Sequence, residues 1–180
     1  NVDSYILSKY VDFYGWQGTA GTTPLGSDTG DATGVRKVLN QQLAPLDDRH
    51  IVMDPNMEAN ALNLRAFQDA SWSGTVDAII SGRLNARLGF QWWMDQNIPT
   101  HTRGTLNVNP LVNGALTAGV KTMNVDSTTL TGTIVKGDIF TFAGHTQTYV
   151  VTNGPLTASA NAIAGVTFEP ALLVNVSDDA

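Results

Sequence analysis

Apolar residues recur at helical spacing over the first 16 residues, with polar residues between them. This period places the apolar side chains on one face of a helix. We predict an amphipathic helix over residues 1–16, ended by Gly15 or Gly18. Its wide, partly aromatic stripe should pack against a large apolar surface. The stripe consists of Val2, Ile6, Tyr10 and Phe13.

A second helical stripe lies between residues 31 and 46. Asp31 or Thr33 is placed to cap this helix, and Pro45 marks its end. The segment 18–34 is rich in glycine, but no strand precedes it and no Gly-Lys-Ser/Thr step closes it. We therefore predict an exposed surface loop there and not a phosphate-binding loop. The helical stripe consists of Val35, Val38, Leu39, Leu43 and Leu46.

The next segment predicts a strand followed by a capped helix. The run "HIVM" over residues 50–53 is typical of a short buried strand. Asp54 followed by Pro55 is the usual order of an N-cap residue and a proline in the first helical turn. The apolar positions that continue this helix are Met57, Ala61, Leu64 and Phe67.

Residues 74–99 predict a short helical stretch and then an extended segment, which Pro99 ends. Alternation along the strand puts Phe90 and Trp92 on one side and Trp93 on the other. The two tryptophans have two interpretations. They form a stacking platform for a sugar or a base, or they are split, with one ring in the core and one in an interface or under a loop, which is the commoner case.

From Leu106 onward the periodic segments are typical of β-structure. Roughly six short runs of β-branched and aromatic residues predict a small barrel or sandwich. The predicted fold class is α+β, with an α+β segment over residues 1–105 and a β-rich domain over residues 106–180. The strand runs are "KTMNV", "GTIVKGDIFTFAG", "TQTYVVT" and "AGVTFEP", and the turn signals are Asn113-Gly114, Gly137-Asp138 and Asn153-Gly154.

The charge pattern argues against direct binding of nucleic acid. The net charge is -6. Eight basic and eleven acidic residues precede Leu106, and two basic and five acidic residues follow it. Neither part has the clustered Lys and Arg that neutralise phosphates. The chain has no Cys, so disulfides and thiolate sites are excluded. It begins at Asn1 and ends at "NVSDDA", and we expect it to be part of a longer protein.

Candidate chemistry is sparse. His50, His101 and His145 are far apart and form no metal-ligand pattern, although His50 follows two aspartates. Glu58 and Asp69 share a face of one predicted helix, which is usually a solvated face. Ser71 and Ser73 lie in no nucleophile motif. We predict no catalytic, metal-binding or cofactor-binding residues.

Two further patterns have structural interpretations. "VKGDIF" over residues 135–140 resembles a ligand loop, but Gly137 can supply the geometry of a plain hairpin corner. Asn175-Val176-Ser177 fits the glycosylation sequon, a pattern that often arises by chance.

The stretch "GFQWWMDQNIPTHTRGT" (89–105), followed by "KGDIFTFAG" (136–144), resembles the major capsid (coat) proteins of tailed bacteriophages. The similarity is to the short-tailed-phage type, which carries an inserted β-domain. In that family a segment like residues 83–89 leads into a strand, which a Pro and a Thr/Gly-rich turn close, as residues 99–105 do here. The matching segments elsewhere are "YVVT" (149–152), "PAL" (170–172) and "HIVMDPNMEANALNL" (50–64). The family's N-terminal arm, its extended loop and the strand-rich end after the insertion have no counterpart.

The resemblance implies the fold shared by tailed-phage and herpesvirus capsids. Residues 1–105 would belong to its peripheral and axial domains, and the β-rich part would be the insertion. It implies a structural protein that self-assembles into hexamers and pentamers of an icosahedral shell around double-stranded DNA. Its partners would be further copies, a scaffolding protein and the portal. It would have no enzyme site, no cofactor and no membrane contact, and would be found in the virion and, during assembly, in the host cytoplasm.

Two other functions remain open. A phage tail or surface-adhesion module would recognise a receptor or glycan through its β-domain, with Trp92, Trp93 or the hairpin loops in contact. The third hypothesis is an enzyme, which would need a clustered catalytic site that the sequence does not display. The strand and capped helix before the β-rich part favour the capsid subunit, since adhesins are usually β throughout.

Overall fold

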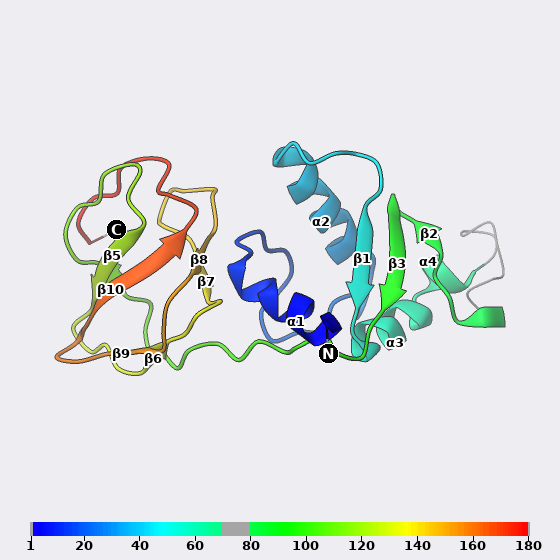
Figure 1. Cartoon of the computed structure of the whole chain (residues 1–180), viewed down its shortest axis with the longest axis horizontal. Coiled ribbons are helices and arrows are strands. Elements are labelled where there is room, and N and C mark those ends of the chain that lie inside the picture. The colour runs from blue at the N-terminus through cyan, green and yellow to red at the C-terminus, as the bar shows by residue number, and fades with distance from the viewer. Residues whose placement is uncertain (1, 70–79, 180) are drawn as a thin grey trace. The chain divides into compact units, whose positions relative to one another are not determined.

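The computed structural model describes residues 2–69 and 80–179. The described chain is mixed α+β and divides into two compact units (Figure 1). The β unit consists of Asn1–Gly15 and Pro99–Ala180, and the α/β unit consists of Trp16–Ile98. The N-terminal segment therefore packs with the β-rich part, and Pro99–Thr105 does so as well. The predicted boundary lay between residues 105 and 106, so both segments were expected in the α+β part. Their residue types suggested this, but their contacts place them with the β unit.

The α/β unit is a three-stranded sheet covered on one face. The strand order is β1-β3-β2, with β1 parallel to β3 and β2 antiparallel to β3. The buried core lies on the face that α2 and α3 cover (Figure 1). The elements are α2 (Gly30–Gln41), β1 (His50–Met53), α3 (Pro55–Asn63), α4 (Arg65–Gln68), β2 (Ala86–Arg87) and β3 (Phe90–Met94).

The predicted strand and capped helix are present, but the strand is not buried as predicted, since only Met53 of its four residues is buried. β1 covers His50–Met53, and the side chain of Asp54 accepts a hydrogen bond from the Met57 amide at 3.1 Å, with Pro55 in the first helical turn. The helix does not continue to Phe67 as predicted, since Leu64 takes an extended conformation between α3 and α4. This break accompanies the packing of the buried Phe67 ring edge-on to Trp92, at 5.4 Å between centroids.

The second helix starts and ends differently from the prediction. α2 begins at Gly30, and its first amide donates to the Asp28 carboxylate, so neither Asp31 nor Thr33 is the cap. Instead Asp31 accepts the Leu25 amide at 2.8 Å. α2 ends at Gln41, before the predicted Pro45, and the predicted stripe residues Leu43 and Leu46 are exposed.

α2 ends where Leu43 takes a left-handed conformation with φ 57°, and the Ala44 amide bonds back to the carbonyl of Leu39 at 3.0 Å. Arg49 holds the segment that follows. Its guanidinium donates to the carbonyls of Ala44 and Pro45 and to the side chain of Asn40, at 2.9, 2.6 and 2.9 Å. The spacing of apolar residues along the helix does not predict these contacts of Arg49.

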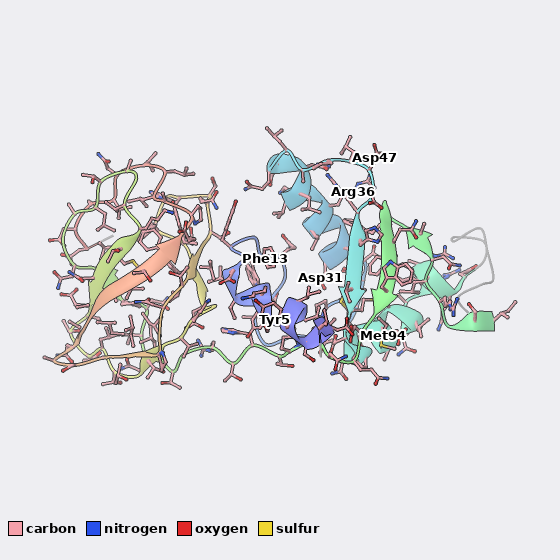
Figure 2. All side chains as sticks on the ribbon, viewed as in Figure 1. Tyr5, Phe13, Asp31, Arg36, Asp47 and Met94 are labelled. Carbon is pink, nitrogen blue, oxygen red and sulfur yellow. The ribbon has the colours of Figure 1, made fainter. Side chains whose placement is uncertain are left out.

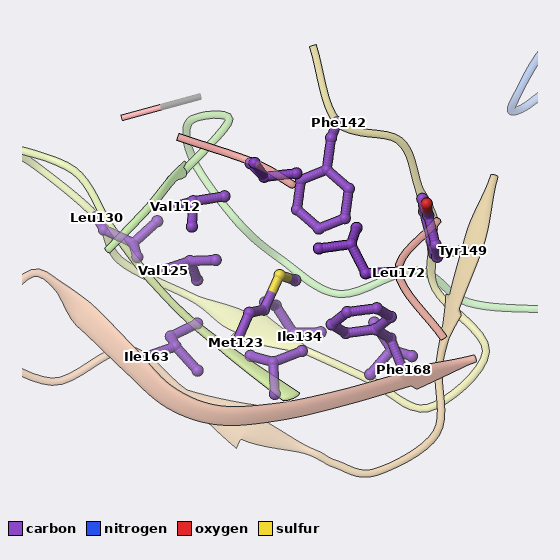
Figure 3. Close-up of a cluster of buried hydrophobic side chains, with 13 residues drawn as sticks. Val112, Met123, Val125, Leu130, Ile134, Phe142, Tyr149, Ile163, Phe168 and Leu172 are labelled. Carbon is purple, nitrogen blue, oxygen red and sulfur yellow. The ribbon is translucent and has the colours of Figure 1, made fainter. Parts of the chain in front are cut away.

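The β unit encloses its own core. Five strands form an antiparallel sheet in the order β4-β5-β10-β8-β7, and β6 pairs with β9. Phe142, Tyr149 and Phe168 meet edge-to-face in the core (Figure 3). The strands are β4 (Leu111–Val112), β5 (Thr122–Asp126), β6 (Thr133–Ile134), β7 (Ile139–Phe140), β8 (Tyr149–Val151), β9 (Leu156–Thr157) and β10 (Ala162–Glu169).

The N-terminal helix is shorter than predicted. α1 covers Val2–Leu7, and a 3-10 helix over Ser8–Asp12 follows, so helical structure ends before Gly15. α1 has no buried residue. Tyr5 and Phe13, labelled in Figure 2, are each 66% exposed, so the predicted apolar packing of this helix is absent from the described contacts.

Candidate functional site

Among the described residues of the α/β unit, one face of the three-stranded sheet carries exposed side chains. Successive strand residues point to opposite sides, so Ile51 and Trp92 face the core while Val52 and Trp93 face outward as register partners. Val52 is 45% exposed and Trp93 is 59% exposed. We call the four outward residues of β1 and β3 the outer sheet face. They are His50, Val52, Gln91 and Trp93.

Hydrogen bonds fix the Trp93 ring on this face. Its indole N–H donates to Nδ1 of His50 at 3.2 Å, and Nε2 of His50 contacts Oδ1 of Asp48 at 2.9 Å. With Nδ1 as acceptor, the neutral imidazole carries its proton on Nε2 and donates it to Asp48. The flat apolar surface of the indole is therefore held in place and left open to a partner.

Trp92 has the opposite environment. It is 7% exposed, and its indole N–H donates to the carbonyl of Arg87 at 3.0 Å. The split interpretation is confirmed for Trp92, which lies in the core, while Trp93 is exposed and its predicted place in an interface stays a prediction. A stacking platform that includes Trp92 is wrong, because its ring is enclosed by Phe67 and Phe90.

A second cluster lies in the β unit at the predicted hairpin corner. The carboxylate of Asp138 accepts the amides of Val135 at 2.9 Å and of Gly104 at 3.2 Å, and it contacts Nε2 of His101 at 3.0 Å. A Cβ at Gly104 would collide with the Thr133 carbonyl, so only glycine permits this close approach. Asp138 thus fastens the connecting segment 99–105 to the hairpin.

His101 extends this cluster to the N-terminal segment. Its Nδ1 lies 3.0 Å from the hydroxyl of Tyr10, and the Tyr10 and His101 rings meet edge-on. We call Tyr10, His101 and Asp138 the relay cluster. A hydroxyl bonded to an imidazole that is in turn bonded to a carboxylate is also the arrangement in which a hydroxyl is activated as a nucleophile. Here the carboxylate is shared with two backbone amides, which favours a role in holding three segments together.

Two further contacts hold the N-terminal segment to the β unit. Nζ of Lys136 lies 2.8 Å from Oδ1 of Asp12. The hydrogen bond from Lys136 lowers the pKa of the Asp12 carboxyl below its usual value. The hydroxyl of Thr148 also donates to the carbonyl of Tyr14. Segment 10–14 is therefore fixed while the apolar side chains of α1 stay exposed.

The other residues singled out in the sequence do not assemble into a site. Oδ2 of Asp69 pairs with Arg65 at 3.1 Å, and Glu58 lies on α3 while Asp69 follows α4, so the shared helix predicted for them is wrong. His145 has Tyr149 as its neighbour, with 3.5 Å between Nδ1 and the hydroxyl. The side chain of Asn175 accepts the Ala118 amide at 2.9 Å. Ser71 and Ser73 lie outside the described residues.

The glycine-rich loop lines a small hollow of about 210 Å³ that includes Trp16, Pro24 and Asp31. Asp31 places a carboxylate at the beginning of α2, where a phosphate would need donors. Within residues 2–69 and 80–179, no three His, Asp or Glu side chains are grouped to hold a metal ion. In the same ranges no helix has the length and apolarity needed to cross a membrane.

The chain was also compared with known proteins. No protein-family model matches it, and no curated protein is significantly similar to it.

The sequence predicted the two sides of β3 but not the hydrogen bond that fixes Trp93. It also did not group Tyr10, His101 and Asp138, which are separated by 91 and 37 positions. The turn signal at Gly137-Asp138 was the visible clue to Asp138, because an aspartate at a hairpin corner often bonds nearby amides.

Proposed function

We propose that the chain is a structural segment of a tailed-phage major capsid protein, which self-assembles into the shell around double-stranded DNA. The observation that carries the proposal is the outer sheet face, where Val52 and Trp93 are side by side and open. An apolar patch beside ordered polar side chains marks a surface that a partner covers. Trp is also among the residues that most often dominate the binding energy of an interface.

The N-terminal segment supports the same proposal. Val2, Tyr5 and Ile6 are between 61% and 72% exposed, on a helix with no buried residue. The relay cluster and the Asp12–Lys136 ion pair hold the following residues to the β unit. A short helix that is fixed at one end and apolar on its surface is suited to contact a neighbouring subunit.

Self-association at several weak contacts is the physical mechanism. Each contact needs only a few kcal/mol, equivalent to about micromolar to millimolar affinity, because closure of a shell adds many identical contacts. Closed symmetric assemblies reuse the same surfaces on each copy. The neighbours in the proposed shell are further copies in hexamers and pentamers, with a scaffolding protein and the portal as assembly partners. The assembly would take place in the host cytoplasm and end in the virion.

In the family resembled, the β unit would be the inserted domain, and residues of the α/β unit would belong to the peripheral and axial domains. The mixed α+β composition and the separate core of the β unit are compatible with this assignment. The glycine-rich loop and the β-hairpins would be mobile in the free subunit and ordered by neighbours. Hydrogen exchange that is equally slow in free subunit and shell would count against this part.

Electron microscopy tests the proposal directly. The proposed capsid protein is expressed with and without its scaffolding partner and imaged in negative stain. We expect closed or partial shells. Trp93→Ser should reduce assembly strongly, while Gln91→Ala, a polar change on the same strand and face, should leave it nearly unchanged. Soluble monomers in every condition would overturn the proposal.

One observation favours a second candidate, a tail or surface-adhesion module. The open face of Trp93, with Asp48 and Gln91 nearby, has the aromatic and polar groups that bind sugars. This candidate predicts binding of glycans by the isolated chain and no shells. In this candidate the glycan would bind to the α/β unit, whereas the sequence suggested binding through the β-rich part.

A further inference from the structure

The chain contains two Asn-Gly steps, at residues 113–114 and 153–154. Asn-Gly is the dipeptide in which the following backbone nitrogen reaches the side-chain carbonyl most easily, because glycine has no Cβ to obstruct it. The structure holds these two steps in different ways. The difference concerns what contacts the backbone nitrogen and how firmly the Asn side chain is held.

At the first step a carboxylate contacts the backbone nitrogen. The Gly114 N–H donates to Oδ1 of Asp178 at 2.6 Å. Asn113 and Gly114 are exposed, and no heavy atom lies within 4 Å of the position that a Cβ on Gly114 would take. The side chain of Asn113 is held through Nδ2, which donates to Oδ2 of Asp126 at 2.7 Å.

At the second step both ends of the side chain are held by backbone groups. Nδ2 of Asn153 donates to the carbonyl of Gly165 at 2.8 Å, and its Oδ1 accepts the amide of Thr167 at 3.0 Å. These two bonds fix the amide plane against β10. Rotation of the Asn153 side chain toward Gly154 would break both bonds.

We propose that Asn113 is a site of self-catalysed deamidation, with Asp178 as the general base. The Gly114 nitrogen attacks Cγ of Asn113, and its proton moves to the Asp178 carboxylate. The bond between Cγ and Nδ2 then breaks, and the amide leaves as ammonia with that proton. The resulting cyclic imide is opened by water at either carbonyl, which gives an aspartyl or isoaspartyl residue. The net change is loss of ammonia and gain of water, with no oxidation.

The product changes the end of the β unit. Asn113 donates a hydrogen bond to Asp126, and its replacement by a carboxylate puts two like charges together. The same region ties down the C-terminal segment, through the pairing of Leu116 with Val176 and the bond from the Asp179 amide to Val112. Deamidation at Asn113 therefore releases residues 176–179 slowly, with time as the only trigger.

Peptide mass mapping of the folded chain during storage at neutral pH tests the proposal. We expect deamidation at Asn113 well before Asn153. Asp178→Asn should slow the reaction at Asn113 on the order of a hundredfold, the low end of what a positioned base contributes. Asp178→Glu, which restores a carboxylate, should recover most of the rate. An unchanged rate in Asp178→Asn with circular dichroism intact would overturn the role of Asp178.

A second measurement does not depend on the variants folding. In urea both steps are unfolded, so their rates should be similar. The ratio of the Asn113 rate to the Asn153 rate should therefore be much larger in the native protein than in urea. An equal or smaller native ratio would show that the fold does not promote the reaction and would overturn the proposal. Asn113→Asp, a mimic of the product, should speed hydrogen exchange at Leu116 and Val176, and unchanged exchange there would overturn the predicted release.

Discussion

Nε2 of His101 lies 3.0 Å from Oδ1 of Asp138, and this contact joins two segments 37 positions apart in the sequence. Side-chain exposure is 27% for His101 and 19% for Asp138. The same carboxylate accepts two backbone amides. Asp138 therefore stabilises three pieces of chain at once: the connecting segment, the hairpin and, through His101, the N-terminal segment.

Asp138→Ala should destabilise the β unit markedly. The substitution removes the acceptor of the Val135 and Gly104 amides and of His101. These donors are partly buried, so each one left without a partner costs toward the lower end of about 1–3 kcal/mol. We expect the free energy of unfolding to fall by roughly 2–5 kcal/mol in urea titrations. Asp47→Ala, at an exposed aspartate labelled in Figure 2, is the control and should change it by less than about 0.5 kcal/mol. Equal effects would contradict the structural role of Asp138.

Tyr10→Phe should loosen the N-terminal segment with little effect elsewhere. It removes one hydroxyl that bonds Nδ1 of His101 and keeps the ring contact. The loss is about 0.5–1.5 kcal/mol, so hydrogen exchange in residues 8–14 should accelerate by roughly threefold to tenfold. Tyr5→Phe is the matched control, because the Tyr5 side chain is 66% exposed. Faster exchange throughout the β unit would indicate a global effect and not the local release we expect.

The Asp12–Lys136 ion pair predicts a pH dependence of the same segment. The pKa of Asp12 is lowered, chiefly by the Lys136 hydrogen bond, relative to its ordinary value of 3.8. The contribution is therefore present above pH 3.8 and is lost as the pH falls through the lowered value. Lys136→Gln should return the Asp12 pKa toward its ordinary value, as measured by NMR titration. Both residues are exposed, so salt should weaken the pair.

That test has a matched control. Lys121→Gln removes an exposed lysine that pairs with Glu169 and not with Asp12, so it should leave the Asp12 titration unchanged. An equal shift of the Asp12 pKa in both variants would show that the loss of any positive charge has this effect and would contradict the role of the Asp12–Lys136 pair.

Truncation of the two neighbouring tryptophans should lower the free energy of unfolding by very different amounts. Trp92→Ala empties a site in the core between Phe67 and Phe90 and should cost about 3–5 kcal/mol in the α/β unit. Trp93→Ala removes a ring that is 59% exposed and should cost less than about 1 kcal/mol. Thermal unfolding followed by circular dichroism measures both. Similar losses in the two variants would mean that the assignment of core and outer face is wrong.

The sequence by itself determined the features that depend on neighbouring residues. The Asp54-Pro55 step fixed the start of α3, because a cap bonds an amide three residues away. Alternation along β3 placed the two tryptophans on opposite sides of the strand, since the strand period is two, and the tertiary structure decided that Trp92 is the buried one. Gly137-Asp138 marked the hairpin corner through its own backbone preference.

Only the tertiary structure decided where helices stop and which segments pack together. Arg49 bonds carbonyls beyond α2 from outside the helical pattern, and Phe67 packs on Trp92 across the break after α3. Tyr10 and Asp138 each contact one ring nitrogen of His101, although no regular spacing in the sequence relates the three residues. A periodic pattern records which face of an element is apolar, but it does not record which distant side chain satisfies its polar groups. Contacts between segments distant in the sequence decide this, and such contacts join residues 1–15 to the β unit.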